Sequence, residues 1–204
     1  MGRVRAYVGL GANVGDAAGT LQAAIHALAA LPDARLRGVS RLYATEPVGL
    51  VDQPEFRNAV AALDVPGGRR PEDGALALLV ALKGLERAFG RQPRERWGPR
   101  EVDLDRLVFG RHRIEAVRPR EGRSGDPAKA SLPLIVPHAA SRNRLFVLAP
   151  LADLAPGLVP PGWGESVATA RDRRLAAEGP EAAHPIARWD GEAWTRPARP
   201  MRPA

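Results

Sequence analysis

The sequence predicts a fold that mixes β-strands and α-helices around a single hydrophobic core. Segments rich in β-branched and aromatic residues alternate along the chain with segments whose apolar residues recur at helical spacing. The chain has 204 residues, enough for one sizeable core with an appended tail. Apolar residues make up 45% and charged residues 26% of the chain, as is usual for a globular domain.

The first part of the chain predicts strand, helix, strand, strand and helix in that order. Strands are indicated by β-branched and aromatic content, and helices by apolar residues at spacings of three and four. Pro32 ends the first helix, whereas Pro71 can start the second and Gly90 can cap it. The predicted elements are a strand at residues 4–10, a helix at 17–31, strands at 34–43 and 56–65, and a helix at 71–89.

The second part predicts shorter elements. They are a strand at residues 102–109, short strands at 112–117 and 132–138, a short helix ending near Pro156 and an amphipathic helix at 166–176. Residues 119–130 have too little apolar content to pack, which predicts a flexible insertion. We expect one domain at residues 1–176 and a poorly structured tail at 177–204, which holds five prolines. The alternative is that Trp189 and Trp194 anchor this tail on the domain.

The motif Asp103-Leu104-Asp105 lies within a predicted strand. Side chains two apart on a strand point to the same face and lie roughly 7 Å apart along the chain, so two acids can share or hold metal ions. Arg96, Trp97 and Arg100 stand just upstream, and together these residue types suit magnesium, phosphate and a flat ring. Taken alone, a DxD motif is more often a solvated strand face or a cap.

The composition of the chain limits the kinds of molecule that it is expected to bind. A net charge of +7 would ordinarily suggest nucleic acid, but the basic residues are almost all arginine and no basic run with interleaved aromatics occurs. We therefore expect a small anionic substrate and no nucleic acid. The chain has no cysteine, no run of 18 apolar residues and no basic-then-apolar leader, so we expect a cytoplasmic protein without a membrane partner.

Four blocks of sequence occur in the order typical of one enzyme family. They are YVGLGANVGD at residues 7–16, YATEPVGLVDQPEFRNAV at 43–60, RWGPREVDLD at 96–105 and VPHAASRNRLFVLAPL at 136–151. On these blocks the chain resembles the 6-hydroxymethyl-7,8-dihydropterin pyrophosphokinases of folate biosynthesis, over roughly residues 4–160. The resemblance implies a ferredoxin-like α/β sandwich of the α+β class, with an antiparallel-rich sheet and additional elements.

The resemblance also implies an activity and a set of site residues. The activity is transfer of pyrophosphate from ATP, the co-substrate, to the pterin hydroxymethyl group with release of AMP. Two Mg²⁺ ions are expected on Asp103 and Asp105, and we expect the enzyme to be a monomer. These two aspartates, with Arg91 and Arg100, form the expected catalytic set. The pterin is expected to be bound by Thr45, Pro47, Val48, Phe56, Asn58, Trp97 and Phe146. ATP is expected to be bound by Lys83, Glu86, Arg91, Arg100, His138 and Arg144.

Two positions depart from the family pattern. Ala139 stands where many members have a tyrosine, which removes one phosphate contact, and Arg106 replaces an apolar residue, which alters the adenine side or lies on an exposed face. These departures motivate a rival hypothesis, a degenerate module that binds pterin or nucleotide without catalysis. A second rival is an RNA-binding protein on the same scaffold, but the chain lacks the surface aromatic motif that such proteins use.

Overall fold

The computed structural model describes residues 2–92, 98–123 and 131–196. The strands are β1 (Arg3–Ala12), β2 (Arg35–Val39), β3 (Leu42–Thr45), β4 (Phe56–Pro66), β5 (Asp103–Phe109), β6 (Ile114–Ala116), β7 (Leu134–Val136), β8 (His184–Trp189) and β9 (Trp194–Thr195). The α-helices are α1 (Ala17–Ala29), α2 (Pro71–Ala88), α3 (Leu145–Leu154) and α4 (Val167–Glu178), and short 3-10 helices are η1 (Arg120–Gly122), η3 (Ser141–Asn143) and η4 (Pro180–Ala183).

Within the described residues, seven strands form one sheet and β6 pairs with β7 in a separate hairpin. The strand order is β5-β1-β4-β3-β8-β9, with β2 also paired to β4, and every pairing is antiparallel. The chain runs β1, α1, β2 and β3, β4, α2, β5, and the central strand order is that of a ferredoxin-like sheet. The predicted fold class is confirmed.

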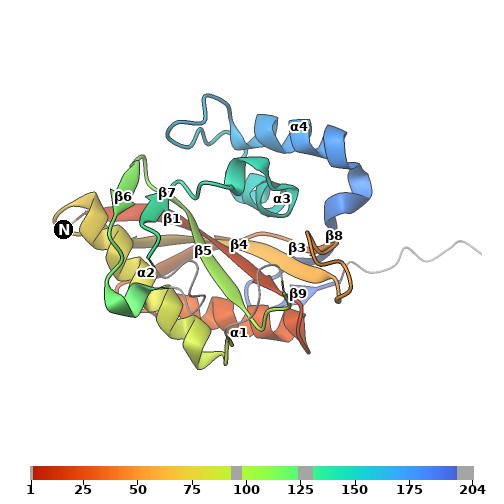
Figure 1. The fold of residues 1–204 in the computed structure, drawn as a ribbon, viewed down its shortest axis with the longest axis horizontal. Coiled ribbons are helices and arrows are strands. Elements are labelled where there is room, and N and C mark those ends of the chain that lie inside the picture. The colour runs from red at the N-terminus through yellow and green to blue at the C-terminus, as the bar shows by residue number, and fades with distance from the viewer. Residues whose placement is uncertain (1, 93–97, 124–130, 197–204) are drawn as a thin grey trace, which may run out of the picture.

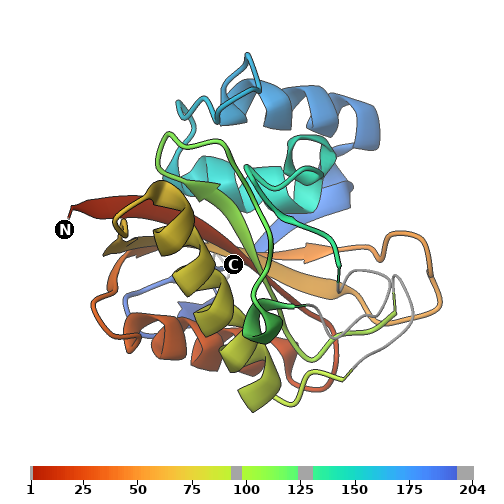
Figure 2. The same cartoon turned by 60° about the vertical axis from the view of Figure 1, so that its left-hand side comes forward.

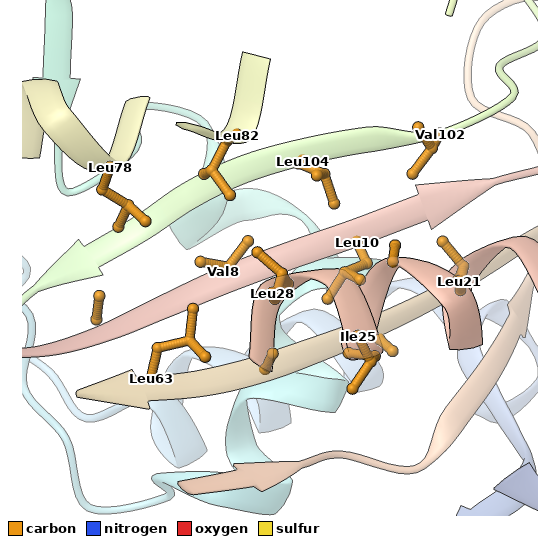
Figure 3. Close-up of a cluster of buried hydrophobic side chains, with 14 of the residues drawn as sticks. Val8, Leu10, Leu21, Ile25, Leu28, Leu63, Leu78, Leu82, Val102 and Leu104 are labelled. Carbon is orange, nitrogen blue, oxygen red and sulfur yellow. The ribbon is translucent and has the colours of Figure 1, made fainter. Parts of the chain in front are cut away.

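Helices cover both faces of the sheet. Helices α1 and α2 lie on one face, and α3 and α4 lie on the other (Figures 1 and 2). The larger core cluster fills the space between the sheet and α1 and α2, where Leu10, Ile25 and Leu82 are almost fully buried (Figure 3). A second cluster, including Val60 and Leu148, joins the opposite face to α3 and α4. These apolar layers leave the end of the sheet near the start of α3 for polar side chains.

The predicted strand at residues 34–43 is divided into β2 and β3. Ser40 lies between them, where its N–H donates to the Val60 carbonyl at 2.9 Å and its hydroxyl accepts from the Val60 N–H at 2.9 Å. The Ser40 hydroxyl oxygen therefore takes the place of a backbone carbonyl as the acceptor for the Val60 N–H. Both backbone groups of Val60 in β4 are thus hydrogen-bonded where the strand is interrupted. The other predicted elements up to residue 178 lie close to their expected bounds.

The prediction of a poorly structured tail is wrong for residues 184–195. Strand β8 pairs with β3, and β9 pairs with β8. The Trp194 indole N–H donates to the Ser40 carbonyl at 3.1 Å, and the Trp189 and Trp194 rings meet edge to face at 5.0 Å. The two tryptophans thus anchor the segment, as the alternative interpretation held, because β3 offers a free edge for a further strand. Residues 197–204 lie outside the described part.

The predicted insertion at residues 119–130 is in part a packed element. Helix η1 lies against α2, and Gly122 is buried so closely that an added Cβ would be 2.9 Å from the Leu79 side chain. Residues 119–123 therefore belong to the fold, and residues 124–130 lie outside the described part. No helix among the described residues is long and apolar enough to cross a membrane.

Candidate active site

The strand register places the two acidic residues of the DxD motif on one face of the sheet. Asp103 lies opposite Gly11 of β1, and Asp105 lies opposite Gly9. Directly opposed residues point to the same side, and Leu104 between the aspartates points into the core beneath α2. Because glycine has no side chain, neighbouring residues approach β1 closely here: an added Cβ would lie 3.0 Å from Asn58 Oδ1 at Gly11 and 3.3 Å from the Leu107 side chain at Gly9. The sequence-based prediction that Asp103 and Asp105 share a face is confirmed.

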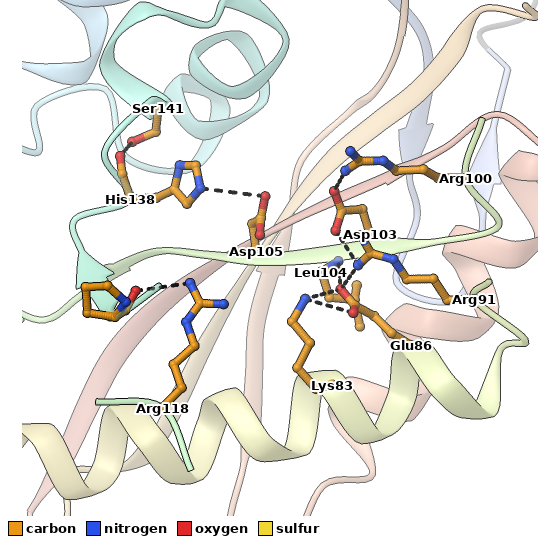
Figure 4. A network of polar contacts seen from close by, with 11 residues as sticks. Lys83, Glu86, Arg91, Arg100, Asp103, Leu104, Asp105, Arg118, His138 and Ser141 are labelled. Carbon is orange, nitrogen blue, oxygen red and sulfur yellow. Dashed lines mark hydrogen bonds and ion pairs between the residues drawn. The ribbon is translucent and has the colours of Figure 1, made fainter. Parts of the chain in front are cut away.

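Asp103 is clamped between two guanidinium groups. One oxygen accepts from Arg91 Nη1 at 2.6 Å, and the other pairs with Arg100 (Figure 4). The Asp103 side chain is only 18% exposed. Burial alone would raise the pKa of this carboxyl, but the charges of Arg100 and Arg91 outweigh that effect and hold the pKa well below its ordinary value. Asp103 is therefore ionised, and its negative charge is shared with both arginines.

A buried ion pair supports this cluster from α2. Lys83 Nζ donates to the two carboxylate oxygens of Glu86 at 2.7 and 2.8 Å, and Arg91 Nη1 lies 2.5 Å from Glu86 Oε1. The same Oε1 accepts from the backbone N–H of Leu104 at 2.8 Å, on the outer edge of β5. Burial raises the pKa of Glu86, while Lys83 and Arg91 oppose the shift. Glu86 thus links α2, Arg91 and the strand that carries the aspartates.

Asp105 faces the segment that leads into α3. His138 Nε2 lies 4.0 Å from Asp105 Oδ2, and both side chains are partly exposed. Arg144 stands at the N-terminal end of α3 with its guanidinium 5.6 Å from the centre of the Phe146 ring. Helix α3 is held on the sheet by Asp153, which pairs with Arg41 at 2.5 Å and accepts from the Tyr43 hydroxyl at 3.0 Å. His138 therefore lies beside Asp105, and Arg144 and Phe146 lie at the start of α3, the helix that the His138 segment leads into.

Three of the residues expected to bind a pterin lie on β3 and β4, and two more lie in the loop between these strands. Asn58 lies opposite Gly11 on the face that carries Asp103, and its side-chain amide donates to the Thr45 hydroxyl at 2.8 Å. Phe56 pairs with Thr45 across the strands and is half-buried. In the loop that follows β3, Pro47 is buried and Val48 is 51% exposed. The structure brings an aromatic face and an amide edge together beside the carboxylates.

Asn13 is a site residue that the sequence-based reasoning missed. It is 3% exposed, and its amide group donates to Gln53 Oε1 and to the Pro54 carbonyl at 3.0 Å each. Its side-chain oxygen accepts from the Arg100 N–H at 2.8 Å, and its own N–H donates to the Arg100 carbonyl at 3.0 Å. One buried amide therefore joins the loop after β3 to the segment that carries Arg100.

The fold and this geometry can now be compared with known proteins. Residues 7–156 match the model of the family described as 7,8-dihydro-6-hydroxymethylpterin-pyrophosphokinase (HPPK). The chain belongs to the HPPK family. The "2-amino-4-hydroxy-6-hydroxymethyldihydropteridine pyrophosphokinase" of Pseudomonas aeruginosa is 43% identical over 154 residues, which cover 76% of this chain and 82% of that protein. The protein of the same name from Bacillus subtilis is 37% identical over 149 residues, or 73% of this chain and 77% of that one.

A solved structure supports the same fold at lower identity. The wild-type HPPK-DHPS of Plasmodium falciparum with pteroate superposes with a TM-score of 0.68 at 15% identity, over 95% of this chain. This chain spans about half of that longer protein, since the match covers 47% of it. The similarity concerns the fold alone.

The donor atoms of this HPPK-family site suit a magnesium ion. Asp103 and Asp105 offer hard carboxylate oxygens from one face of β5, beside the two glycines. No group of three or more His, Cys, Asp or Glu that could hold a metal occurs among the described residues. Mg²⁺ commonly takes one or two protein carboxylates and fills its remaining positions with water and substrate phosphates, so a pair of aspartates is sufficient.

Three positions singled out by the comparison with the HPPK family pattern need separate comment. Trp97 lies outside the described residues. Arg106 does not lie on an exposed face: it is 7% exposed, and burial lowers its pKa to about 10. Ala139 is exposed, beside the partly exposed His138.

Proposed function

We propose that this protein transfers the pyrophosphoryl group of ATP to the hydroxymethyl group of 6-hydroxymethyl-7,8-dihydropterin, giving the pterin diphosphate and AMP in folate biosynthesis. The observation that carries the proposal is the pair Asp103 and Asp105 on one face of β5, with Arg91 and Arg100 beside Asp103, in a chain of the HPPK family. Its relatives in Pseudomonas aeruginosa and Bacillus subtilis carry the name of that enzyme.

Two Mg²⁺ ions are proposed on Asp103 and Asp105, where they supply Lewis-acid neutralisation of the triphosphate. To bind metal, Asp103 must give up part of its pairing with Arg91 and Arg100. The two guanidiniums then become available for phosphate oxygens, which they can contact through paired N–H groups. Arg91 keeps Glu86 as a second partner during this exchange, so its side chain stays positioned.

The chemistry needs no nucleophilic side chain. The pterin hydroxyl oxygen attacks the β-phosphorus, the bond from that phosphorus to the oxygen of the α-phosphate breaks, and AMP leaves with the bonding electron pair. The hydroxyl proton passes to solvent, because the depressed pKa of Asp103 makes this carboxylate a weak proton acceptor. Arg91 and Arg100 stabilise the charge on the transferred group, which is the main requirement of phosphoryl transfer.

The pterin is proposed to lie between the rings of Phe56 and Phe146. A flat heterocycle gains from stacking on aromatic faces, and the Asn58 amide can bond its polar edge. Asn58 is oriented for this by Thr45, which accepts one of its amide hydrogens. Backbone groups of Pro47 and Val48 complete this side, and we propose that Trp97 closes over it.

The ATP side is proposed to include His138 and Arg144 as phosphate contacts, with Lys83 and Glu86 at its border. Because Lys83 and Glu86 bond one another and Glu86 bonds the backbone of β5, Glu86 acts mainly as a positioning residue for Arg91 and for the strand. We further propose that the enzyme is monomeric and acts in the cytoplasm on these small molecules.

AMP release from ATP, with and without 6-hydroxymethyl-7,8-dihydropterin, tests the proposal. We expect AMP to form with the pterin alcohol and Mg²⁺, and only traces without either. Pterin binding without AMP formation would instead identify a non-catalytic module. Tight binding of single-stranded RNA that weakens steeply with salt would favour the RNA-binding alternative.

A further inference from the structure

One tyrosine beside the proposed pterin site belongs to a row of residues that crosses the sheet. Tyr43 of β3 is paired with Asn58 of β4, and Asn58 is paired in turn with Gly11 of β1. Gly11 is paired with Asp103 of β5. Directly opposed residues point to the same face, so Tyr43 lies next to Asn58 on the face that α3 covers (Figures 1 and 2). Thr45, two residues further along β3, shares this face.

Tyr43 packs on a single stripe of α3. Leu145, Ala149 and Asp153 recur every four residues, so they lie along one side of that helix. The Tyr43 ring is 3% exposed and forms a buried cluster with Leu145, Ala149 and Ala183. Its hydroxyl donates to Asp153 Oδ1 at 3.0 Å. One side chain thus lies against both the first and the last turn of α3.

The polar end of this contact makes the docking of α3 specific. Asp153 also pairs with Arg41, and the Arg41 guanidinium lies 5.4 Å from the centre of the Tyr43 ring. An apolar contact alone can form at several rotations of a helix, because the hydrophobic effect has no direction. The hydrogen bond and the ion pair form at one rotation, since both depend on geometry. Tyr43 therefore selects one rotation of α3 about its axis.

The rotation of α3 decides where Phe146 points. Phe146 follows Leu145 directly, and successive residues of a helix are about 100° apart around its axis. Leu145 is 2% exposed in the cluster with Tyr43, whereas Phe146 stays partly exposed. A turn of the helix that moved Leu145 off the Tyr43 ring would therefore also move the Phe146 ring.

We propose that Tyr43 is a positioning residue for the pterin, which fixes the rotation of α3 and with it the placement of the Phe146 ring opposite Phe56. This inference rests on the proposed function and adds to it a residue that contacts neither substrate. The segment after α4 supports the same contact, since Ala183 of η4 packs in the Tyr43 cluster and Pro185 of β8 pairs with Tyr43. Residues beyond 156, where the family match ends, are thus linked to pterin binding.

Calorimetry on folded variants tests the proposal. The pterin alcohol is titrated in the presence of Mg²⁺ and a non-hydrolysable ATP analogue, and the analogue is titrated separately. We expect Tyr43→Phe, which loses only the hydroxyl, to weaken pterin binding by about threefold, and Tyr43→Leu to weaken it by about tenfold. The affinity for the analogue should stay near the wild-type value. If Tyr43→Leu does not fold, Tyr43→Phe carries the test.

The matched control is Tyr7→Phe. Tyr7 is the other of the two tyrosines in the chain, and it packs against the second core cluster under the same helix. It stands on β1 on the side of Gly9 away from Gly11, so its hydroxyl is remote from the proposed pterin contacts. Both affinities should stay at the wild-type value in this variant. A loss of pterin affinity equal to that of Tyr43→Phe would overturn the specific role of Tyr43.

A double-mutant cycle separates positioning from general stability. Because the Tyr43 hydroxyl acts through Asp153, Asp153→Ala should weaken pterin binding, and adding Tyr43→Phe should weaken it no further. Additive losses would overturn this link. Trp194→Ala removes an anchor at the other end of β8, so it should lower the melting temperature and leave pterin affinity unchanged. Weaker pterin binding in Trp194→Ala would show that lost stability alone explains the effect.

A fluorine spectrum reports on Phe146 without any ligand. The chain has four phenylalanines, so protein labelled with 4-fluorophenylalanine should give four signals. We expect Tyr43→Leu to shift the Phe146 signal, which Phe146→Leu identifies, while the signal of Phe109, buried in the core on the other face, stays in place.

The outcomes of these measurements are distinct. An unmoved Phe146 signal, or unchanged pterin affinity in folded Tyr43→Leu, overturns the inference. A wild type that binds pterin and releases no AMP overturns the proposed reaction, while the binding comparison still decides the role of Tyr43. A wild type that binds no pterin overturns the proposed substrate, and the fluorine signal then decides whether Tyr43 sets the position of the ring.

Discussion

Trp194 provides a sharp test of whether the C-terminal segment is part of the folded domain. It stands in β9, donates its indole N–H to the Ser40 carbonyl and packs edge to face on Trp189. Replacing it by alanine removes the buried ring area, the ring contact and the hydrogen bond together. We expect Trp194→Ala to destabilise the protein and leave the arrangement of the site residues unchanged.

The magnitude follows from the contacts. A large aromatic side chain buries about 150–250 Å². Trp194 is half-buried, so about 100 Å² contributes about 2.5 kcal/mol at about 25 cal/mol per Å². The ring contact adds about 0.5–1.5 kcal/mol, and the hydrogen bond adds about 1 kcal/mol. Ordering this short segment offsets part of the sum, so the expected loss is about 3 kcal/mol.

Thermal unfolding followed by far-ultraviolet circular dichroism measures this loss. For a domain of this size, about 3 kcal/mol lowers the melting temperature by about 6–12 °C. Trp194→Phe keeps a ring but loses the donor, so its free energy of unfolding should fall by about 1 kcal/mol. Thr195→Ala, at an exposed neighbouring position, is the control. If Trp194→Ala and Thr195→Ala melt within about 2 °C of each other, the segment does not stabilise the domain as described.

Three further predictions concern the site. Asp103→Asn should lose most turnover in the AMP assay, at a cost of several kcal/mol in transition-state stabilisation. The folded-state pKa of Asp103 is depressed, so its contribution to the free energy of unfolding is present above the unfolded-state pKa and is lost on acidification. In urea titrations, the difference in free energy of unfolding between wild type and Asp103→Asn should therefore narrow as the pH falls below about 4. Asn13→Ala should lower the free energy of unfolding by about 1–3 kcal/mol. Steady-state kinetics should also show a fall in kcat, because the loop after β3 and the backbone of Arg100 lose their shared partner. A normal kcat in a folded variant would contradict this. Phe146→Ala should weaken pterin binding by about 1–3 kcal/mol and ATP-analogue binding far less in calorimetry, and equal losses would mean that the ring is only part of the core.

The sequence predicted those parts of the site that depend on local periodicity. Asp103 and Asp105 share a face because strand side chains alternate, and the register opposite Gly9 and Gly11 confirms it. Asn13 was missed because its partners lie 40, 41 and 87 residues away, so no local pattern reveals them. Segment 184–189 was missed because its strand is stabilised by pairing with β3 from a distant part of the chain.

Arg106 shows a different limit of prediction. The alternation of β5 places it on the core side with Leu104, but an arginine ordinarily indicates solvent. Only the packing of α2 and the segment after β6 shows that the guanidinium is enclosed. The family resemblance identified the position as unusual, and the structure located the side chain.

The bond from Glu86 to the Leu104 N–H has a consequence for the behaviour of the protein in concentrated solution. Strand β5 is the outermost strand at its end of the sheet, and outermost strands with free N–H and C=O groups are templates for pairing with another molecule. The Glu86 carboxylate occupies the Leu104 donor, and the His138 N–H occupies the Leu107 carbonyl at 3.0 Å. Two of the groups through which a foreign strand would join this edge are thus already bonded. The strand that bears Asp103 and Asp105, the acids proposed to bind metal, can remain at the rim, open to small substrates, and still resist self-association.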